Sequence, residues 1–259
     1  MNDHTTFTPL SPNPSPSREK EAFVDILAAH PQWKPLICNA LEAMNPNYLH
    51  EIMQEKTCIP ATHQLFAAFS LPLSETKYIL FGESPYPRKA SANGFAFWDE
   101  AVGSLWSESG LSKEVNKATS LRNLLKTLLV ARGDLHSDLS QAAISKLDKN
   151  SMIQTASDLF LRMMQQGILL LNASLVYSEG KVPYHARNWR PFMQKLLDQL
   201  VLVKPDIQLI LFGKIAEAIP QSQLTIGLQA EHPYNVSFIT NKQVLNFFNP
   251  LDLLANESI

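Results

Sequence analysis

The segment Tyr78–Trp98, with the sequence YILFGESPYPRKASANGFAFW, constrains the fold more than any other part of the chain. It opens with four uncharged apolar residues, which predict a strand buried on both faces. Pro85 and Pro87 then rule out a helix, because each proline also restricts the residue before it to extended geometry. Open α/β sheets carry their functional sites in loops that follow buried strands. We therefore expect such a site at the carboxyl end of this strand.

Three other stretches also predict strands. Ile168–Asn172 and Ile207–Phe212 are apolar runs, and Leu224–Ala230 alternates weakly between apolar and polar residues. Long helical patterns separate the strands, and this alternation favours parallel pairing with helices on both faces. The sequence therefore predicts an α/β fold, a three-layer α/β/α sandwich with a four-stranded, mainly parallel central sheet. The expected helices include Ala118–Ala131, Ser151–Gln166 with Ser151 as its cap, and Trp189–Val203 with Pro191 in its first turn.

Side chains capable of chemistry follow three of the four expected strands. The residues Glu83–Tyr86 follow the first strand, Asn172 ends the second, and His232 follows the last. Because the carboxyl ends of parallel strands meet at one edge of a sheet, we expect these side chains to lie together. The residues themselves thus predict a functional site at that edge.

Composition excludes several classes of protein. Residues 1–18 are rich in proline, serine and threonine and predict a disordered tail, which leaves residues 19–259 as one domain. Cys38 and Cys58 have no neighbouring Cys or His at ligand spacing, which argues against a zinc or iron–sulfur site. No apolar run reaches the roughly 18 residues of a membrane span and no signal peptide is recognisable, so we expect a cytoplasmic protein. A net charge of −2 gives no global basic field, so DNA would need a local positive patch.

The loop after the first strand resembles the water-activating loop of family 1 uracil-DNA glycosylases. That family has Gly-Gln-Asp-Pro-Tyr followed by His or Pro, and then Gly-Leu-Ala-Phe after a short gap. The resemblance extends over roughly residues 33–256, and several fragments agree in order and spacing. These fragments are Gly82-Glu83-Ser84-Pro85-Tyr86-Pro87, Gly94-Phe95-Ala96-Phe97, Leu170-Leu171-Asn172, Tyr184-His185-Ala186 before Trp189, and His232-Pro233 with Ser237.

The resemblance implies excision of uracil from DNA, with roles for five residues of a base pocket. Phe97 would stack on the extruded base, and the Asn172 amide would read the edge that distinguishes uracil from cytosine. Tyr86 would exclude the methyl group of thymine, and Glu83 takes the place of the family's glutamine beside the substrate. His232 would donate to O2 of uracil, where negative charge grows as the glycosidic bond breaks.

The resemblance also implies a face that contacts DNA. Val236 stands where the family has its wedge leucine, and Ser237 follows it in the same loop. Ser120 corresponds to the serine of the loop that pinches the DNA backbone, and His185 lies in the matching Ser-His-Ala stretch. We expect a monomer that binds uracil-containing DNA without a metal or cofactor. The positive side chains available for DNA are Arg88, Lys89, Lys181, Arg187, Arg190, Lys214 and Lys242.

Ser84 is the main departure from the family pattern, because it occupies the position of the catalytic aspartate. A serine hydroxyl can hold a water, but it does not act as a base at neutral pH. Loss of a positioned base typically costs about 10²–10⁴-fold in rate, so we expect an enzyme of reduced activity. Whether Glu83 substitutes as the base stays open. The alternative is a catalytically inactive relative that keeps the fold and binds DNA, a nucleobase or a protein partner.

Overall fold

A four-stranded parallel sheet forms the centre of the computed structural model, which describes residues 28–55 and 57–256. The strand order is β4-β1-β5-β6, and all three neighbouring pairs run parallel. The predicted α/β fold with a four-stranded parallel sheet is therefore confirmed, while the expected tail over residues 1–18 lies outside the described residues. The strands are β1 (Tyr78–Gly82), β4 (Ile168–Asn172), β5 (Gln208–Phe212) and β6 (Thr225–Ala230).

Both faces of the sheet are buried along β1, β4 and β5, which explains why these strands are apolar at consecutive positions, whereas the edge strand β6 is largely exposed. Along β1, Ile79 and Phe81 join the hydrophobic cluster on one face, whereas Leu80 joins the cluster on the other. Successive side chains of a strand point to opposite faces, so a strand covered on both sides needs apolar residues throughout.

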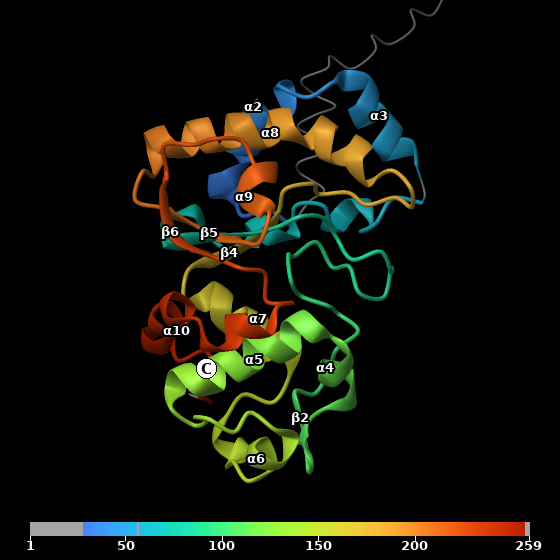
Figure 1. Ribbon diagram of the computed structural model, residues 1–259. Coiled ribbons are helices and arrows are strands. Elements are labelled where there is room, and N and C mark those ends of the chain that lie inside the picture. Colours follow the sequence, from blue (N-terminus) through green and yellow to red (C-terminus); the bar gives the residue numbers. More distant parts are fainter. Residues whose placement is uncertain (1–27, 56, 257–259) are drawn as a thin grey trace, which may run out of the picture.

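Helices cover the two faces of the sheet as separate layers (Figure 1). The first layer contains α2 (Lys34–Glu42), α3 (Pro46–Gln54) and α8 (Val182–Val203). On the opposite face lie α5 (Thr119–Arg132), α7 (Ala156–Gln165) and α10 (Lys242–Phe248). The three short α-helices are α4 (Lys113–Lys117), α6 (Gln141–Ser145) and α9 (Ile215–Ala218).

Two helices begin elsewhere than their sequences predict. The expected start of a helix at Trp189 is wrong, because α8 begins at Val182 with Pro183 in its first turn, and Pro191 lies inside it. The expected cap at Ser151 is also wrong. The cap of α7 is Thr155, whose hydroxyl accepts from the Asp158 N–H while the Asp158 carboxylate accepts from the Thr155 N–H.

The polar stretch after the first loop contains a small hairpin, β2 (Trp106–Ser107) and β3 (Gly110–Leu111), which pair antiparallel. None of the described helices is long and apolar enough to cross a membrane. Single turns of 3-10 helix complete the described elements. They are Pro31–Trp33, Thr62–Gln64, Ala67–Ser70, Leu73–Glu75, Lys149–Ser151, Val236–Thr240 (η6) and Asn249–Leu251.

Candidate active site

The loops that follow β1 and β4 stay paired beyond the end of the sheet. Gly82 and Asn172 are register partners at the last position of the two strands. The backbone N–H of Ala173 then donates to the Gly82 carbonyl at 2.8 Å, and that of Ser174 donates to the Glu83 carbonyl at 3.0 Å. The pairing fixes Glu83 and Asn172 on the same rim, as the strand-end argument predicts.

Asn172 is buried against Gly82, with 3% of its surface exposed. Its Oδ1 lies 2.5 Å from the point where a Cβ on Gly82 would stand. No other described residue makes a hydrogen bond to the Asn172 side chain. Because a buried amide without a partner is costly, this amide offers both a donor and an acceptor to a ligand that enters the rim.

Phe97 is held in a left-handed backbone conformation, with φ of 64°, which side chains of its size rarely adopt. The preceding N–H of Ala96 donates to the Leu170 carbonyl at 3.0 Å, which docks this segment on β4. The Phe97 ring stacks on His232, with centroids 5.9 Å apart, and meets Phe212 edge-on. Strained conformations of this kind cluster at functional sites, and here the strain aims an aromatic face at His232.

His232 is fixed as a neutral hydrogen-bond donor. Its Nδ1 accepts from the Tyr234 N–H at 3.1 Å, so the proton of the neutral ring resides on Nε2. Burial lowers the pKa of the His232 ring below its ordinary value, and the charge of Glu83 opposes that shift only in part. At neutral pH the ring therefore presents an Nε2–H without a positive charge.

A cavity of about 220 Å³ opens beside these groups. Its charged and polar lining comes from the ends of three different strands, namely Glu83 after β1, Lys214 after β5 and His232 after β6. Gly213, with φ of 64°, lets the β5 end pass close to His232, whose Cβ lies 2.9 Å from where a Gly213 Cβ would stand. The remaining lining residues are Phe81, Gly82, Phe97, Phe212, Ile215 and Ala218.

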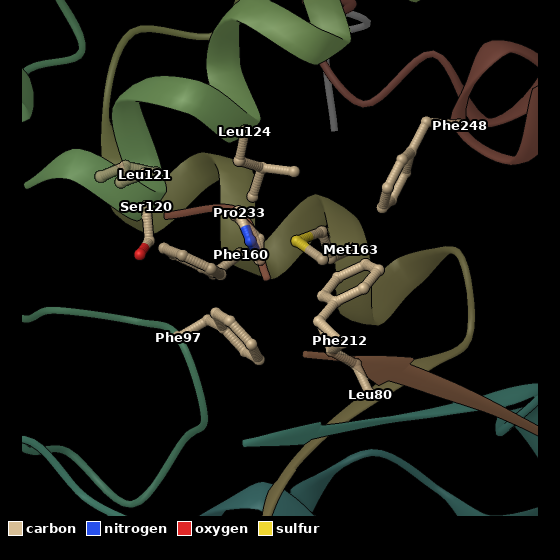
Figure 2. A pocket seen from close by; sticks show the side chains of 10 residues that line it. All are labelled: Leu80, Phe97, Ser120, Leu121, Leu124, Phe160, Met163, Phe212, Pro233 and Phe248. Atoms are coloured by element: carbon tan, nitrogen blue, oxygen red, sulfur yellow. The ribbon is translucent and has the colours of Figure 1, made fainter. Parts of the chain in front are cut away.

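A second hollow, which Phe97 also lines, lies between the sheet and α5 (Figure 2). Its volume of about 10 Å³ has space for no more than a water, so it cannot hold a base. Ser120 is its only polar lining residue and lies at its edge near the start of α5, while Pro233 approaches from the loop after β6. The hollow therefore shows that Ser120 and the loop carrying Val236 lie close together.

Tyr86 stabilises the segment that contains Phe97. Its hydroxyl donates to the Phe97 carbonyl at 3.2 Å. Burial raises the pKa of Tyr86 to about 12, and the nearby Asp99 carboxylate adds to the shift, so the phenol stays neutral. Ser84, on the same loop, is half-buried, and its hydroxyl makes no hydrogen bond to any described residue. It is absent from the lining of the large cavity, whereas Glu83 is part of it.

The loop after β6 exposes two large apolar side chains. Val236 is 71% exposed and Tyr234 is 67% exposed, and Ser237 beside them is also exposed. Sequence reasoning selected Val236 and missed Tyr234. The loop therefore presents an aromatic and an aliphatic side chain to solvent.

The structure corrects the expectation that His185 contacts DNA. His185 is fully buried, its Nδ1 lies 2.8 Å from the Tyr48 hydroxyl, and its Nε2 lies 3.0 Å from Ser178 Oγ. With both nitrogens occupied, the ring joins α3 to the start of α8 instead. The polar sequence around His185 gave no sign of this burial, because its partners are distant along the chain.

Several of the predicted positive side chains are already paired. Arg88 forms an ion pair with Asp99, and Lys181 lies between Glu51 and Glu55. Lys214 lines the large cavity and forms no ion pair with the described residues. In residues 28–55 and 57–256, no three His, Cys, Asp or Glu side chains gather where a metal ion would fit.

Gly82→Ala should shift Asn172 and destabilise the fold, because its new Cβ would lie 2.5 Å from Asn172 Oδ1 and 2.9 Å from Ala96 Cβ. Overpacking of this kind typically costs about 1–3 kcal/mol, which denaturant unfolding would measure. Gly103→Ala is the matched control, since nothing lies within 4 Å of its Cβ position. Equal stability of the two variants would contradict the close packing of Asn172 on Gly82.

Comparison with known proteins relates the chain to uracil-DNA glycosylases, although no family model matches it. It is 31% identical over 200 residues to the uracil-DNA glycosylase of Lactococcus lactis subsp. cremoris, covering 73% of this chain and 75% of that protein. With the Amoebophilus asiaticus uracil-DNA glycosylase it shares 28% identity over 215 residues, covering 78% of this chain and 83% of the relative.

Solved structures support the same relationship. The crystal structure of wild-type UNG from Nitratifractor salsuginis matches with a TM-score of 0.88 and 37% identity, covering 95% of this chain and 100% of that one. The mimivirus uracil-DNA glycosylase matches with a TM-score of 0.53 at 17% identity, covering 82% of this chain and 71% of that one, a likeness that concerns the fold alone.

Proposed function

The chain belongs to the uracil-DNA glycosylase family, and from this premise we propose that it hydrolyses the N-glycosidic bond of uracil in DNA during base excision repair. The proposed partner is uracil-containing DNA, and the proposed reaction uses neither metal nor cofactor. One observation carries the proposal. The buried Asn172 amide, unpartnered among the described residues, lies on the same rim as a cavity lined by His232. A monomeric state and a cytoplasmic location stay predictions.

The proposed roles follow from what excision requires. The base must leave the stack, at a cost of a few kcal/mol, before a pocket can hold it. Phe97 offers an aromatic face for the extruded base, and the Asn172 amide offers the paired donor and acceptor that uracil's edge needs. Tyr86, fixed against the Phe97 carbonyl, would close the pocket against the methyl group of thymine.

His232 would stabilise the leaving group. As the glycosidic bond breaks, negative charge accumulates on the departing uracil, and a positioned N–H beside O2 lowers the energy of that state. The Nε2–H of a neutral imidazole suits this role, because the Tyr234 N–H occupies Nδ1 and leaves Nε2 as the donor. His232 therefore supplies the hydrogen-bond donor that the proposed mechanism needs at the departing uracil.

Activation of the attacking water is the step of the proposed mechanism that lacks the family's usual residue. On this proposal Ser84 takes the position of the family's catalytic aspartate, where it would hold the attacking water without accepting its proton. A positioned base contributes about 10²–10⁴-fold, so we expect slower excision than in members with the aspartate. Glu83 is the one carboxylate in the lining of the large cavity and is therefore the candidate to assist.

Glu83→Gln should lower the rate of uracil excision about 10²-fold if the Glu83 carboxylate accepts the proton of the water. Single-turnover rates on a uracil-containing single strand would measure the effect. Glu108→Gln removes the same charge from an exposed position at the β2–β3 turn and should leave the rate unchanged. Equal rates for Glu83→Gln and the natural chain would exclude Glu83 from the mechanism.

The DNA-contacting surface we propose is the loop after β6 together with the start of α5. Val236 would fill the stack that the uracil vacates, and the exposed Tyr234 ring would add a second apolar contact. On this proposal Ser237 and Ser120 would bond the DNA backbone. Lys214 would supply positive charge at the cavity rim. Because the chain has a net charge of −2, binding to DNA phosphates would depend on such local positive groups.

A direct assay tests the proposal: release of free uracil from a single-stranded oligonucleotide with one uracil, compared with the same strand carrying thymine or cytosine. We expect slow release from the uracil strand alone. The alternative function is DNA or nucleobase binding without catalysis, which the neutral Ser84 favours. Tight binding of the uracil strand with no release, even at long times, would support that alternative and contradict the enzyme.

A further inference from the structure

We propose that Asn123 of α5 is a positioning residue, which fixes the His232 ring by holding the peptide group between Pro233 and Tyr234. The effect of Asn123 on catalysis rests on the proposed function, whereas its effect on the position of the His232 ring does not. Asn123 matches no motif of the sequence, and it lies far along the chain from the residues that it contacts.

Asn123 is a buried amide aimed at the loop after β6. It is 2% exposed, and its Nδ2 donates to the Pro233 carbonyl at 2.7 Å. The same nitrogen lies 3.3 Å from the Tyr234 carbonyl and 3.4 Å from the Asn235 carbonyl. One side chain thus gathers three successive carbonyls, which an exposed loop could not otherwise keep turned inward.

The shortest of these bonds connects to His232 through a single rigid unit. The Pro233 carbonyl and the Tyr234 N–H belong to the same planar peptide group, so fixing the oxygen also fixes the direction of the N–H. That N–H donates to His232 Nδ1 at 3.1 Å. Hydrogen bonds in such a chain polarise one another, so donation from Asn123 also strengthens the bond to His232.

The chain of bonds determines which nitrogen of His232 carries the proton. While the Tyr234 N–H points at Nδ1, the proton must reside on Nε2, the atom proposed to face the substrate. Other charged groups approach His232 without replacing this bond. Glu83 and Lys214 line the cavity from the ends of β1 and β5, and the Glu231 carboxylate accepts from Asn241.

The rest of the loop gives the peptide little alternative support. The Asn235 N–H donates to the His232 carbonyl at 2.9 Å, which closes the turn without bonding the Pro233–Tyr234 peptide itself. Buried residues of the loop include Pro233, which lines the hollow beside α5, and Phe238, which packs against Phe212. Between His232 and Phe238, Tyr234 and Val236 both point into solvent. Asn123 is therefore the buried polar group that orders this turn.

Long-range ¹H–¹⁵N NMR of the His232 ring tests the proposal, because the two nitrogens have distinct shifts in each tautomer. In the natural chain Nδ1 should appear as the acceptor and Nε2 as the protonated nitrogen. Asn123→Asp keeps the shape but removes the donor, and it should shift His232 toward a mixture of tautomers. Excision should fall about 10–100-fold, the range found for groups that orient metal ligands, with KM changed much less than kcat.

Thr127→Val is the matched control. Thr127 is fully buried one turn further along α5, donates to the Asn123 carbonyl at 2.9 Å and makes no hydrogen bond to the described residues of the loop. It should change neither the His232 shifts nor the rate. In a His232→Ala background, Asn123→Asp should have almost no further effect on excision, since positioning residues and their targets are not additive.

Unchanged His232 shifts in a folded Asn123→Asp variant would overturn the proposal. Asn123→Ser, which is too short to reach the carbonyls, provides the same measurement should the aspartate variant not fold. The NMR result does not depend on activity. A natural chain that releases no uracil would therefore remove the proposed function while leaving the role of Asn123 in holding His232 to be decided by the ring shifts.

Discussion

Replacing His232 with alanine is expected to lower kcat for uracil excision about 10²–10³-fold, the usual effect of removing one donor to a developing negative charge. The variant loses the Nε2–H that the Tyr234 N–H secures by occupying Nδ1. The fold should survive, because the ring lies at a half-buried loop position and the strands do not depend on it. Single-turnover kinetics on a single-stranded uracil substrate, with circular dichroism to verify folding, would measure the effect.

The pH dependence of the rate distinguishes a neutral from a charged His232. Because burial lowers its pKa below the ordinary value of about 6.5, the ring is more than half neutral at pH 6.5 and takes up its proton further into acid. The rate attributed to His232 should therefore be constant at neutral and alkaline pH and fall as pH drops into the acid range. A rate that falls as pH rises through about 6.5 would show that the cation is the active form.

The same lowered pKa has a consequence for stability. The unfolded chain binds a proton at His232 more readily than the folded chain does, so the folded state loses stability as pH falls below about 6.5. The fully buried His185 ring, whose pKa burial also lowers, acts in the same direction. Both contributions are fully present at neutral pH and above.

The sheet could be predicted from sequence because burial on both faces demands uninterrupted apolar runs. The expected strand Ile168–Asn172 matches β4, and the expected strands over 207–212 and 224–230 differ from β5 and β6 by one residue. The start of α8 was not predictable in this way. Pro191 suggested a first turn, yet a proline at that position is tolerated inside a helix long enough to be held by packing on α2.

The candidate site, like the fold, could be predicted from the sequence only in part. The places of Asn172 at the end of β4 and of His232 just after β6 were predictable, because they follow from the strand boundaries alone. Asn123 and His185 were missed or misassigned because their roles depend on partners that are remote in sequence. The carbonyls of the loop after β6 give Asn123 its role, and Tyr48 and Ser178 remove His185 from the surface. Contacts between residues so far apart in the chain leave no local pattern in the sequence.

Restoring an acid at the water position should have the opposite effect to removing His232. Ser84→Asp is expected to raise the rate of uracil excision about 10²–10⁴-fold, because a carboxylate can accept the proton of the attacking water and stabilise positive charge on the sugar. The Ser84 hydroxyl makes no hydrogen bond with the described residues, so the exchange breaks no such interaction in the loop. Release of uracil under single-turnover conditions would measure the gain.

Ser84→Asn is the control, since it has nearly the shape of aspartate without its charge or basicity. A gain confined to Ser84→Asp would assign the deficit to the missing base, whereas equal gains in both variants would assign it to the positioning of water.

The activity of the natural chain then decides between the two proposed functions. Slow excision that His232→Ala abolishes supports the enzyme, and activity found only in Ser84→Asp would mean that the natural chain keeps the pocket but has lost the chemistry. If Ser84→Asp releases uracil no faster than the natural chain, the assignment of Ser84 to the water position is wrong, because a carboxylate there would lower the barrier by about 3–5 kcal/mol.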